Sequence, residues 1–220
     1  MDRLFFWRHI IRVRKELYLN KQNIISKGKE YVRSFDGDVS PDISRCALII
    51  LDMQRYFTRP DSNAYIPSSD AIIPGILSLE RHFRSLGLPI FYTRHINNNK
   101  NAGMMGKWWN KLISEDNPDS LLHERLSPKK EEIFNKSQYD AFLKTDLEES
   151  LRMAEINKVM IAGVMTHLCC ETTARSAFCR GFEVLFCGNA TSTYNEDFHK
   201  ASLLNLSHGF AKIIDIYDII

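Results

Sequence analysis

The chain has 220 residues, 44% of them apolar and 25% charged, and its formal net charge is +2. This length and composition favour one globular α/β domain, and the small net charge gives no reason to expect nucleic acid as a partner. No apolar run approaches the roughly 20 residues that span a membrane, and five cysteines without a C-x-x-C pair do not resemble a secreted disulfide framework. We therefore expect a cytoplasmic protein with reduced thiols.

The first 33 residues are basic, with nine lysines and arginines against three acidic residues. Leu4, Trp7, Ile11 and Leu17 recur at roughly helical spacing, which predicts an amphipathic helical arm that packs on the body or on a second subunit. A helix on a membrane surface is the alternative, because basic and aromatic residues coexist. Gly, Pro, Ser and Asp in residues 34–44 are typical of a linker. The predicted division is an arm with its linker over 1–45 and a main domain over 46–220.

Beyond the linker, short apolar runs alternate with segments of helical periodicity. Predicted strands cover 46–51, 89–93, 132–135, 158–163, 183–187 and 211–214. Predicted helices cover 68–86, 145–153, 169–180 and 196–207. This alternation predicts a mainly parallel, six-stranded sheet with helices on both faces.

Chemically versatile side chains follow four of the predicted strands. In parallel sheets, ligands bind beyond the carboxyl ends of the strands, near the point where strand order reverses. Asp52 follows the first strand, Arg94 and His95 end the second, Lys136 follows the third, and Cys169 lies in the turn after the fourth. A carboxylate, an ammonium and a thiol are therefore expected on one rim of the sheet.

Cys169 is the candidate nucleophile. It precedes a predicted helix, whose dipole lowers the pKa of a thiol at its N-terminus, and a nearby lysine lowers that pKa further. Backbone N–H groups of the same turn can hold an oxyanion when a carbonyl is attacked. The alternative is a small buried residue that begins a helix. Cys170 is expected to point about 100° away, into packing.

Asp52 and Lys136 are the candidate partners of this thiol. A carboxylate at the end of a buried strand is costly unless it is paired or functional, and a general base is needed near the nucleophile. The alternatives are a strand-end aspartate that caps a loop and a solvated surface lysine. Taken alone, neither residue decides the matter.

Four stretches of sequence stand at these positions: LDMQ at 51–54 with Phe57, TRH at 93–95, KSQYDAF at 136–142, and GVMTHLC at 163–169 followed by Thr172, Thr173 and Ala174. In this order and spacing they resemble the motifs of the isochorismatase-like superfamily of cysteine hydrolases. The resemblance spans residues 46 to about 214 and leaves the arm outside.

The resemblance implies a three-layer α/β/α, Rossmann-like fold and a catalytic triad of Asp52, Lys136 and Cys169. It also implies a cis peptide between Val164 and Met165, with the amides of Met165 and Cys169 forming the oxyanion hole. The implied reaction is attack of Cys169 on an amide, carbamoyl or ureido carbonyl to give a thioester. No cofactor is implied.

Two other functions remain open. True isochorismatases cleave a vinyl ether without a covalent intermediate. Their motif at the corresponding position is usually G-V-Y-A-H, and His167 resembles the histidine of that motif. Thr166 and Cys169 instead resemble the amidohydrolases, and the cysteine favours that branch. The second alternative is a catalytically silent member that binds a partner through its basic arm.

A small molecule is the expected partner, with Phe57, Arg94, Trp108, Tyr139 and His167 as the expected substrate contacts. Arg94 is the candidate for a substrate carboxylate, and His167 is alternatively a pocket wall or a helix cap. Residues 97–112 follow the second strand and are expected to form a lid. This lid or the arm is expected to mediate a homo-oligomer.

No metal is expected. Nicotinamidases bind zinc through an Asp-x-His and a second histidine soon after the first strand, whereas this chain has Asp61, Ser62 and Asn63 there. The remaining histidines show no ligand spacing.

Overall fold

The structure, a computed structural model, describes residues 13–32, 39–109 and 111–220. Residues 1–12 of the predicted arm and 34–38 of the predicted linker lie outside the described residues. In the part of the chain that is described, no helix is long and apolar enough to cross a membrane.

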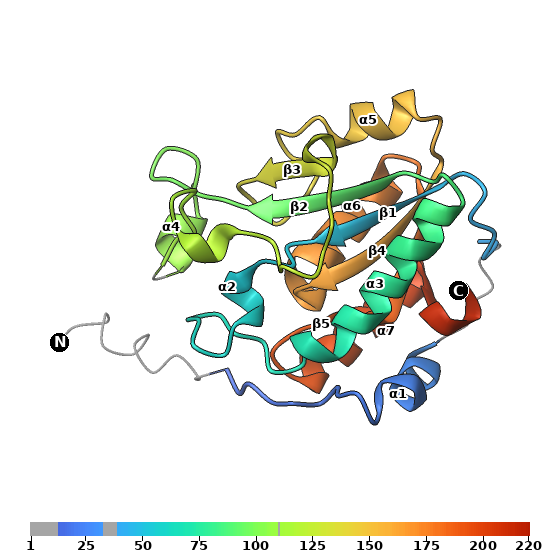
Figure 1. Ribbon diagram of the computed structural model, residues 1–220, viewed down its shortest axis with the longest axis horizontal. Helices are drawn as coiled ribbons and strands as arrows, with labels where there is room; N and C mark the ends of the chain where they lie inside the picture. The colour runs from blue at the N-terminus through green and yellow to red at the C-terminus, as the bar shows by residue number, and fades with distance from the viewer. Residues whose placement is uncertain (1–12, 33–38, 110) are drawn as a thin grey trace.

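A six-stranded parallel sheet forms the centre of the molecule (Figure 1). Its strands lie in the order β3-β2-β1-β4-β5-β6. They are β1 (Cys46–Leu51), β2 (Ile90–His95), β3 (Ile133–Lys136), β4 (Lys158–Val164), β5 (Glu183–Ser192) and β6 (Lys212–Ile214). The predicted six-stranded parallel sheet is confirmed, with each predicted strand present at boundaries shifted by a few residues.

Helices cover both faces of the sheet, which confirms the three-layer α/β/α architecture (Figure 1). The longest, α3, crosses one face, whereas α5, α6 and α7 cover the other, and α1 lies beside β5 and β6. The helices are α1 (Ile24–Tyr31), α2 (Arg55–Thr58), α3 (Ser69–Ser85), α4 (Met105–Trp108), α5 (Leu147–Met153), α6 (Glu171–Cys179) and α7 (Glu196–Gly209).

The apolar strands divide their side chains between two cores. Successive strand residues point to opposite faces, so Leu48 and Ile50 of β1 pack under α3 while Ala47 and Ile49 pack toward α5, α6 and α7. Every residue of β1 and of β4 is buried. A strand covered on both faces therefore reads as an unbroken apolar run rather than an alternating one.

The order of the strands reverses between β1 and β4. The chain proceeds from β1 outward to β2 and β3, and then returns to place β4 on the other side of β1. The loops after β1 and β4 leave the sheet in opposite directions at this point, which opens a crevice beyond the strand ends. Asp52 and the turn that carries Cys169 are the first residues of these two loops to reach it.

Three local predictions differ from the structure. Residues 13–20 form no helix, because their backbone runs extended along the body and bonds to it rather than to itself. A π-helical turn, Thr166–Cys170, precedes α6, so Cys169 lies inside that turn rather than at the first helical residue. β5 continues past residue 187 to Ser192. Gly188 and Asn189 lie where its pairing with β4 is irregular, and this bulge interrupts the pairing without ending the strand.

Candidate active site

Four polar side chains meet beyond the strand ends, one each from the ends of β1, β2 and β3 and one from the turn after β4. Lys136 lies at their centre: its Nζ is 2.8 Å from Asp52 Oδ2, 3.2 Å from Cys169 Sγ and 3.3 Å from His95 Nδ1. The same nitrogen donates to Gln138 O at 3.0 Å. The structure thus brings together the three residues of the predicted triad and adds a histidine to them.

Asp52 is held by its own strand end and by the neighbouring strand. Its backbone takes a left-handed conformation, φ +50°, which aspartate tolerates better than most residues. Thr93 Oγ1 donates to Asp52 Oδ1 at 2.6 Å and accepts from Asp52 N at 3.1 Å. Burial opposes ionisation of this carboxyl, but the positive charge of Lys136 outweighs it and holds the pKa of Asp52 below its usual value.

Lys136 is a buried cation. Its side chain is fully buried, and so is that of Asp52. Burial alone lowers the pKa of an ammonium, yet the negative charge of Asp52 reverses the effect and raises the pKa of Lys136 above its ordinary value. The resting site therefore holds a carboxylate and an ammonium as a buried ion pair.

Cys169 rests as a thiol. Burial, followed by the negative charge of Asp52, raises its pKa to about 12, and the opposite influence of Lys136 is smaller. The predicted lowering of this pKa is therefore not found: the turn carries the thiol into a closed site that already contains a carboxylate. A thiol with this pKa needs a base to become a nucleophile, and a carboxylate oxygen of Asp52 lies within 4.8 Å of its sulfur.

His95 is neutral, with its proton on Nε2. Its Nε2 lies 2.6 Å from Asn97 Oδ1, and the Asn97 amide is oriented by a bond from Nδ2 to Ser137 O at 2.7 Å. Asn97 thus accepts from His95, which leaves Nδ1 as an acceptor facing Lys136. Burial and the charge of Lys136 lower the pKa of His95 to about 4. The sequence indicated His95 by its place after the second strand and by the TRH stretch, but assigned it no role in the site.

Gln54 fixes the backbone at the end of β2. Its side-chain oxygen accepts from His95 N at 2.8 Å, and its Nε2 donates to His95 O at 3.2 Å and to Ser120 O at 2.8 Å. Gln54 is completely buried, and these bonds satisfy backbone groups that would otherwise be left without partners. The glutamine of the LDMQ stretch therefore positions His95 and does not face the cavity.

The peptide bond between Val164 and Met165 is cis, which confirms the conformation implied by the motif. Just before it, Gly163 has φ +111° and lies against β1: a Cβ built there would be 2.1 Å from Leu51 O. Only glycine permits this approach. The close packing of β1 and β4 at this point sets the position of the turn that carries Cys169 relative to Asp52.

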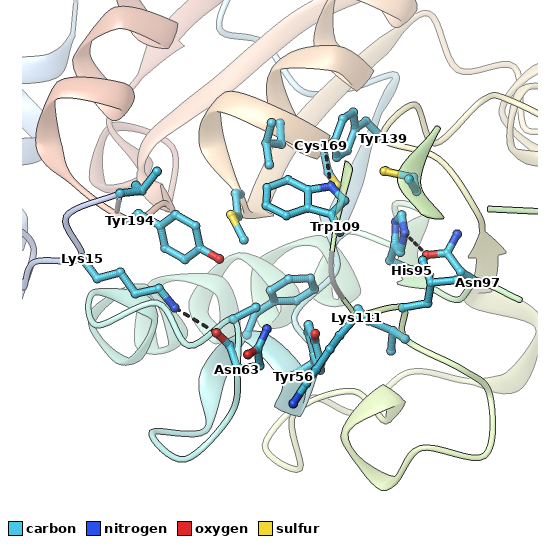
Figure 2. Close-up of a pocket in the computed structure, with 18 residues that line it drawn as sticks. Lys15, Tyr56, Asn63, His95, Asn97, Trp109, Lys111, Tyr139, Cys169 and Tyr194 are labelled. Atoms are coloured by element: carbon cyan, nitrogen blue, oxygen red, sulfur yellow. Dashed lines mark hydrogen bonds between the residues drawn. The ribbon is translucent and has the colours of Figure 1, made fainter. Parts of the chain in front are cut away.

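A cavity of about 460 Å³ opens in front of Cys169 (Figure 2). This volume suits a small molecule. Trp109 lies across the cavity, and its Nε1 donates to Tyr139 Oη at 2.8 Å. The lining comprises Val13, Lys15, Tyr56, Phe57, Asn63, Ala64, His95, Asn97, Met105, Trp109, Lys111, Leu112, Ile113, Tyr139, Met165, Leu168, Cys169 and Tyr194.

Two of the five expected substrate contacts, Phe57 and Tyr139, belong to this lining, whereas Arg94, Trp108 and His167 do not. Trp108 is 71% exposed, because it ends α4 on its solvent side and the following residue, Trp109, faces the cavity instead. The expected lid over 97–112 contributes several lining residues.

Arg94 and His167 point elsewhere for separate reasons. Strand alternation places Arg94 on the face of the sheet opposite to His95. His167 is bonded through Nδ1 to Thr193 Oγ1 at 2.6 Å, and its ring stacks on Phe198 with centroids 4.4 Å apart. Burial lowers the pKa of His167 to about 4, so it is a neutral packing residue beside the turn.

Asp52, His95 and Cys169 have donor atoms within 4.8 Å of one another, which is a spacing that metal ligands also adopt. The ammonium of Lys136 lies within 3.3 Å of all three, and a second cation there would be repelled. The stretch where nicotinamidases hold zinc does not fit the ion either, because Asp61 Oδ2 is bound to Arg59 at 2.6 Å and no histidine accompanies it. We derive no step through a metal.

A buried thiol beside a carboxylate and an ammonium, on the rim of a parallel α/β/α sheet, defines the chain as a cysteine hydrolase. The isochorismatase domain model matches residues 46–218, and the chain belongs to the isochorismatase family.

Several relatives are similar to it. Nicotinamidase 3 of Arabidopsis thaliana is 37% identical over 182 residues, which span 80% of this chain and 87% of that protein. N-carbamoylsarcosine amidase of an Arthrobacter species is 29% identical over 63% of this chain and 56% of its own length. Among solved structures, a cysteine hydrolase from Pseudomonas syringae pv. phaseolicola superposes with a TM-score of 0.78 at 25% identity, covering 86% of this chain and 94% of that one.

Proposed function

We propose that the chain is an amidohydrolase that cleaves the C–N bond of a small amide, carbamoyl or ureido compound through a thioester on Cys169. The contact of Lys136 Nζ with both Asp52 Oδ2 and Cys169 Sγ, on the wall of a cavity of substrate size, carries the proposal. It joins a base, a nucleophile and a fixed positive charge at one point.

The first half-reaction forms the thioester. Asp52 takes the proton from Cys169 Sγ, and the sulfur attacks the carbonyl carbon. Lys136 stabilises the negative charge that passes from the carboxylate to the sulfur, because its distance to both atoms is already that of a hydrogen bond. The amides of Met165 and Cys169 are assigned to the oxyanion that forms on the carbonyl oxygen.

The thioester is complete only when the tetrahedral adduct loses its nitrogen, and hydrolysis of the thioester then returns the enzyme to its starting state. Asp52 gives its proton to the departing nitrogen, the C–N bond breaks, and an amine or ammonia leaves. A water then attacks the thioester while Asp52 accepts one of its protons. The acid is released, and the proton held by Asp52 returns to the sulfur, so each turnover consumes one water.

The relatives support amide chemistry over ether cleavage. Nicotinamidase 3 and N-carbamoylsarcosine amidase are both amidases by name. A relative that is not named an amidase, enterobactin synthase component B of Escherichia coli, is less similar than Nicotinamidase 3: it is 27% identical over 72% of this chain and 56% of its own length. The thiol in hydrogen-bond contact with the central lysine favours a covalent route, which ether cleavage does not require.

Ammonia release from a panel of small amides and ureides tests the proposal, with wild type compared with Cys169→Ala. We expect turnover in wild type and none in Cys169→Ala, whereas Cys179→Ala, which alters an exposed thiol, is the matched control and keeps full activity. Rapid acid quenching followed by peptide mass analysis should find the acyl group on Cys169. Equal turnover in wild type and Cys169→Ala contradicts the nucleophile assignment, and no turnover on any compound favours the ether-cleaving or silent alternatives.

A further inference from the structure

The segment that precedes the family domain forms part of the cavity wall. The family model begins at residue 46, yet Val13 and Lys15 belong to the lining. Residues 13–20 form no helix or strand and run along the lower edge of the molecule in Figure 1, below α3 and α7. One side of the binding site is therefore built by a part of the chain that the family domain does not contain.

Backbone contacts fix this segment in place. Glu16 N donates to Tyr194 O at 2.8 Å, in the loop after β5. The amides of Tyr18 and Leu19 both donate to Ser68 Oγ at 3.1 Å, at the start of α3. Leu19 is completely buried, and Tyr18 is 7% exposed. On the other side of Lys15, Asn195 Nδ2 donates to Arg14 O at 3.0 Å, so the backbone that carries this lysine is held at both neighbouring residues.

Among the described residues, the ammonium of Lys15 has neutral partners only. Its Nζ donates to Asn63 O at 3.1 Å and lies 4.5 Å from the centre of the Tyr194 ring. The carboxylate of the adjacent Glu16 is directed away, toward Arg14 at 3.1 Å. Burial lowers the pKa of Lys15, as expected of a cation that has lost water without gaining a counter-charge.

Lys111, from the predicted lid, is the second lysine of the lining. Neither lysine forms an ion pair with the described residues. The described lining contains no aspartate or glutamate, and His95 is neutral. Lys15 Nζ donates to Asn63 O, and in Figure 2 the ammonium groups of both lysines point away from Cys169. The outer part of the cavity is therefore positive and unneutralised.

We propose that Lys15 and Lys111 bind an anionic group of the substrate, so that the preferred substrate is a planar amide with a carboxylate at the end remote from the scissile bond. The aromatic rings of Tyr56, Phe57 and Trp109 line the space between and suit a planar body. This inference rests on the amidase function proposed above and assigns its specificity to the arm and the lid.

Benzamide and 4-carbamoylbenzoate form a matched pair of probes that differ only by the remote carboxylate. The measurement is the ratio of kcat/KM for the acid to kcat/KM for benzamide. We expect this ratio to exceed about tenfold in wild type, because a hydrogen bond to a charged group in a partly dry site is worth at least that factor. Lys15→Met and Lys111→Met should each reduce the ratio, and Lys15→Arg should keep most of it. Lys21→Met, an exposed lysine of the same segment outside the lining, is the control and should leave it unchanged.

The possible results distinguish failure of the lysine–carboxylate inference from failure of the amidase function. A ratio near one in wild type, or a ratio that survives Lys15→Met with Lys111→Met, overturns the inference while Cys169-dependent ammonia release leaves the amidase function standing. If neither amide is hydrolysed, the amidase function fails, and calorimetric binding of 4-carbamoylbenzoate to Cys169→Ala decides the inference separately. Binding that is lost in the Lys15→Met background supports charge recognition, and no binding overturns it.

Discussion

Replacing Lys136 by methionine tests the buried ion pair. The change removes the ammonium 2.8 Å from Asp52 Oδ2 and keeps a side chain of similar length. Asp52 then remains completely buried, with the hydroxyl of Thr93 as its side-chain partner. Removing one partner of a buried pair costs about 3–5 kcal/mol, a large part of the roughly 5–15 kcal/mol that stabilises a typical domain.

The pH dependence of stability should also change sign. In wild type the pKa of Asp52 is lowered, so its contribution to stability is present above the unfolded pKa and is lost as the pH falls through the folded value. In Lys136→Met, burial acts without the opposing charge and raises the pKa of Asp52 above the unfolded value. The folded state then binds more protons than the unfolded state, and stability falls as the pH rises, by up to about 1.4 kcal/mol per pH unit.

Urea unfolding followed by circular dichroism, at several pH values between about 5 and 8, measures both effects. Adding Asp52→Asn to Lys136→Met should abolish the new slope, since the carboxyl that gave rise to it is gone. Lys100→Met removes an exposed lysine and should resemble wild type. If Lys136→Met were as stable as wild type at neutral pH and showed no new slope, Asp52 would not depend on Lys136 for its charge, and the description of the site would be wrong.

Three further predictions follow from single contacts. In a Cys179→Ser background, alkylation of Cys169 by iodoacetamide should still accelerate above pH 9.0, the ordinary thiol pKa, because the Cys169 pKa is about 12; a plateau near neutral pH would contradict this. Gly163→Ala should lower the free energy of unfolding by about 3 kcal/mol in urea titrations, because its Cβ would collide with Leu51 O; a loss below about 1 kcal/mol would mean that β1 and β4 adjust freely. Trp109→Phe, which loses the bond to Tyr139, should raise KM about five-fold with little change in kcat, whereas Trp108→Phe should leave both constants unchanged.

The strands and the rim could be predicted because their signals are local and strong. The CALIIL run of β1 has the length and unbroken apolar character typical of a strand covered on both faces, so Asp52 is placed at a strand end by its position in the sequence. Lys136 and the turn that carries Cys169 are likewise placed by their positions after predicted strands. Parallel pairing then brings these ends to one edge, so the gathering of a carboxylate, an ammonium and a thiol follows from order along the chain, whereas their roles as a triad came from the family resemblance.

Other features depend on three-dimensional neighbours that the sequence does not name. The raised pKa of Cys169 comes from burial and from Asp52, neither of which a helix start reveals. Arg94 and His95 are adjacent in sequence. β2 ends two residues later than predicted, at His95, so both residues belong to the strand and strand alternation places them on opposite faces. Leu17 belongs to the helical spacing predicted for the arm, yet the backbone of residues 13–20 bonds to the body rather than to itself.

The four atoms around Lys136 Nζ outnumber its protons. An ammonium has three N–H groups, so Lys136 cannot donate a hydrogen bond to Asp52, Gln138, His95 and Cys169 at the same time. While the sulfur is a thiol it is the weakest acceptor of the four, and the third proton belongs to His95. Once the sulfur is a thiolate, its charge makes it the stronger acceptor. A rotation about the Cε–Nζ bond then transfers the hydrogen bond from ring to sulfur, so the lysine can follow the charge without any heavy atom leaving its place.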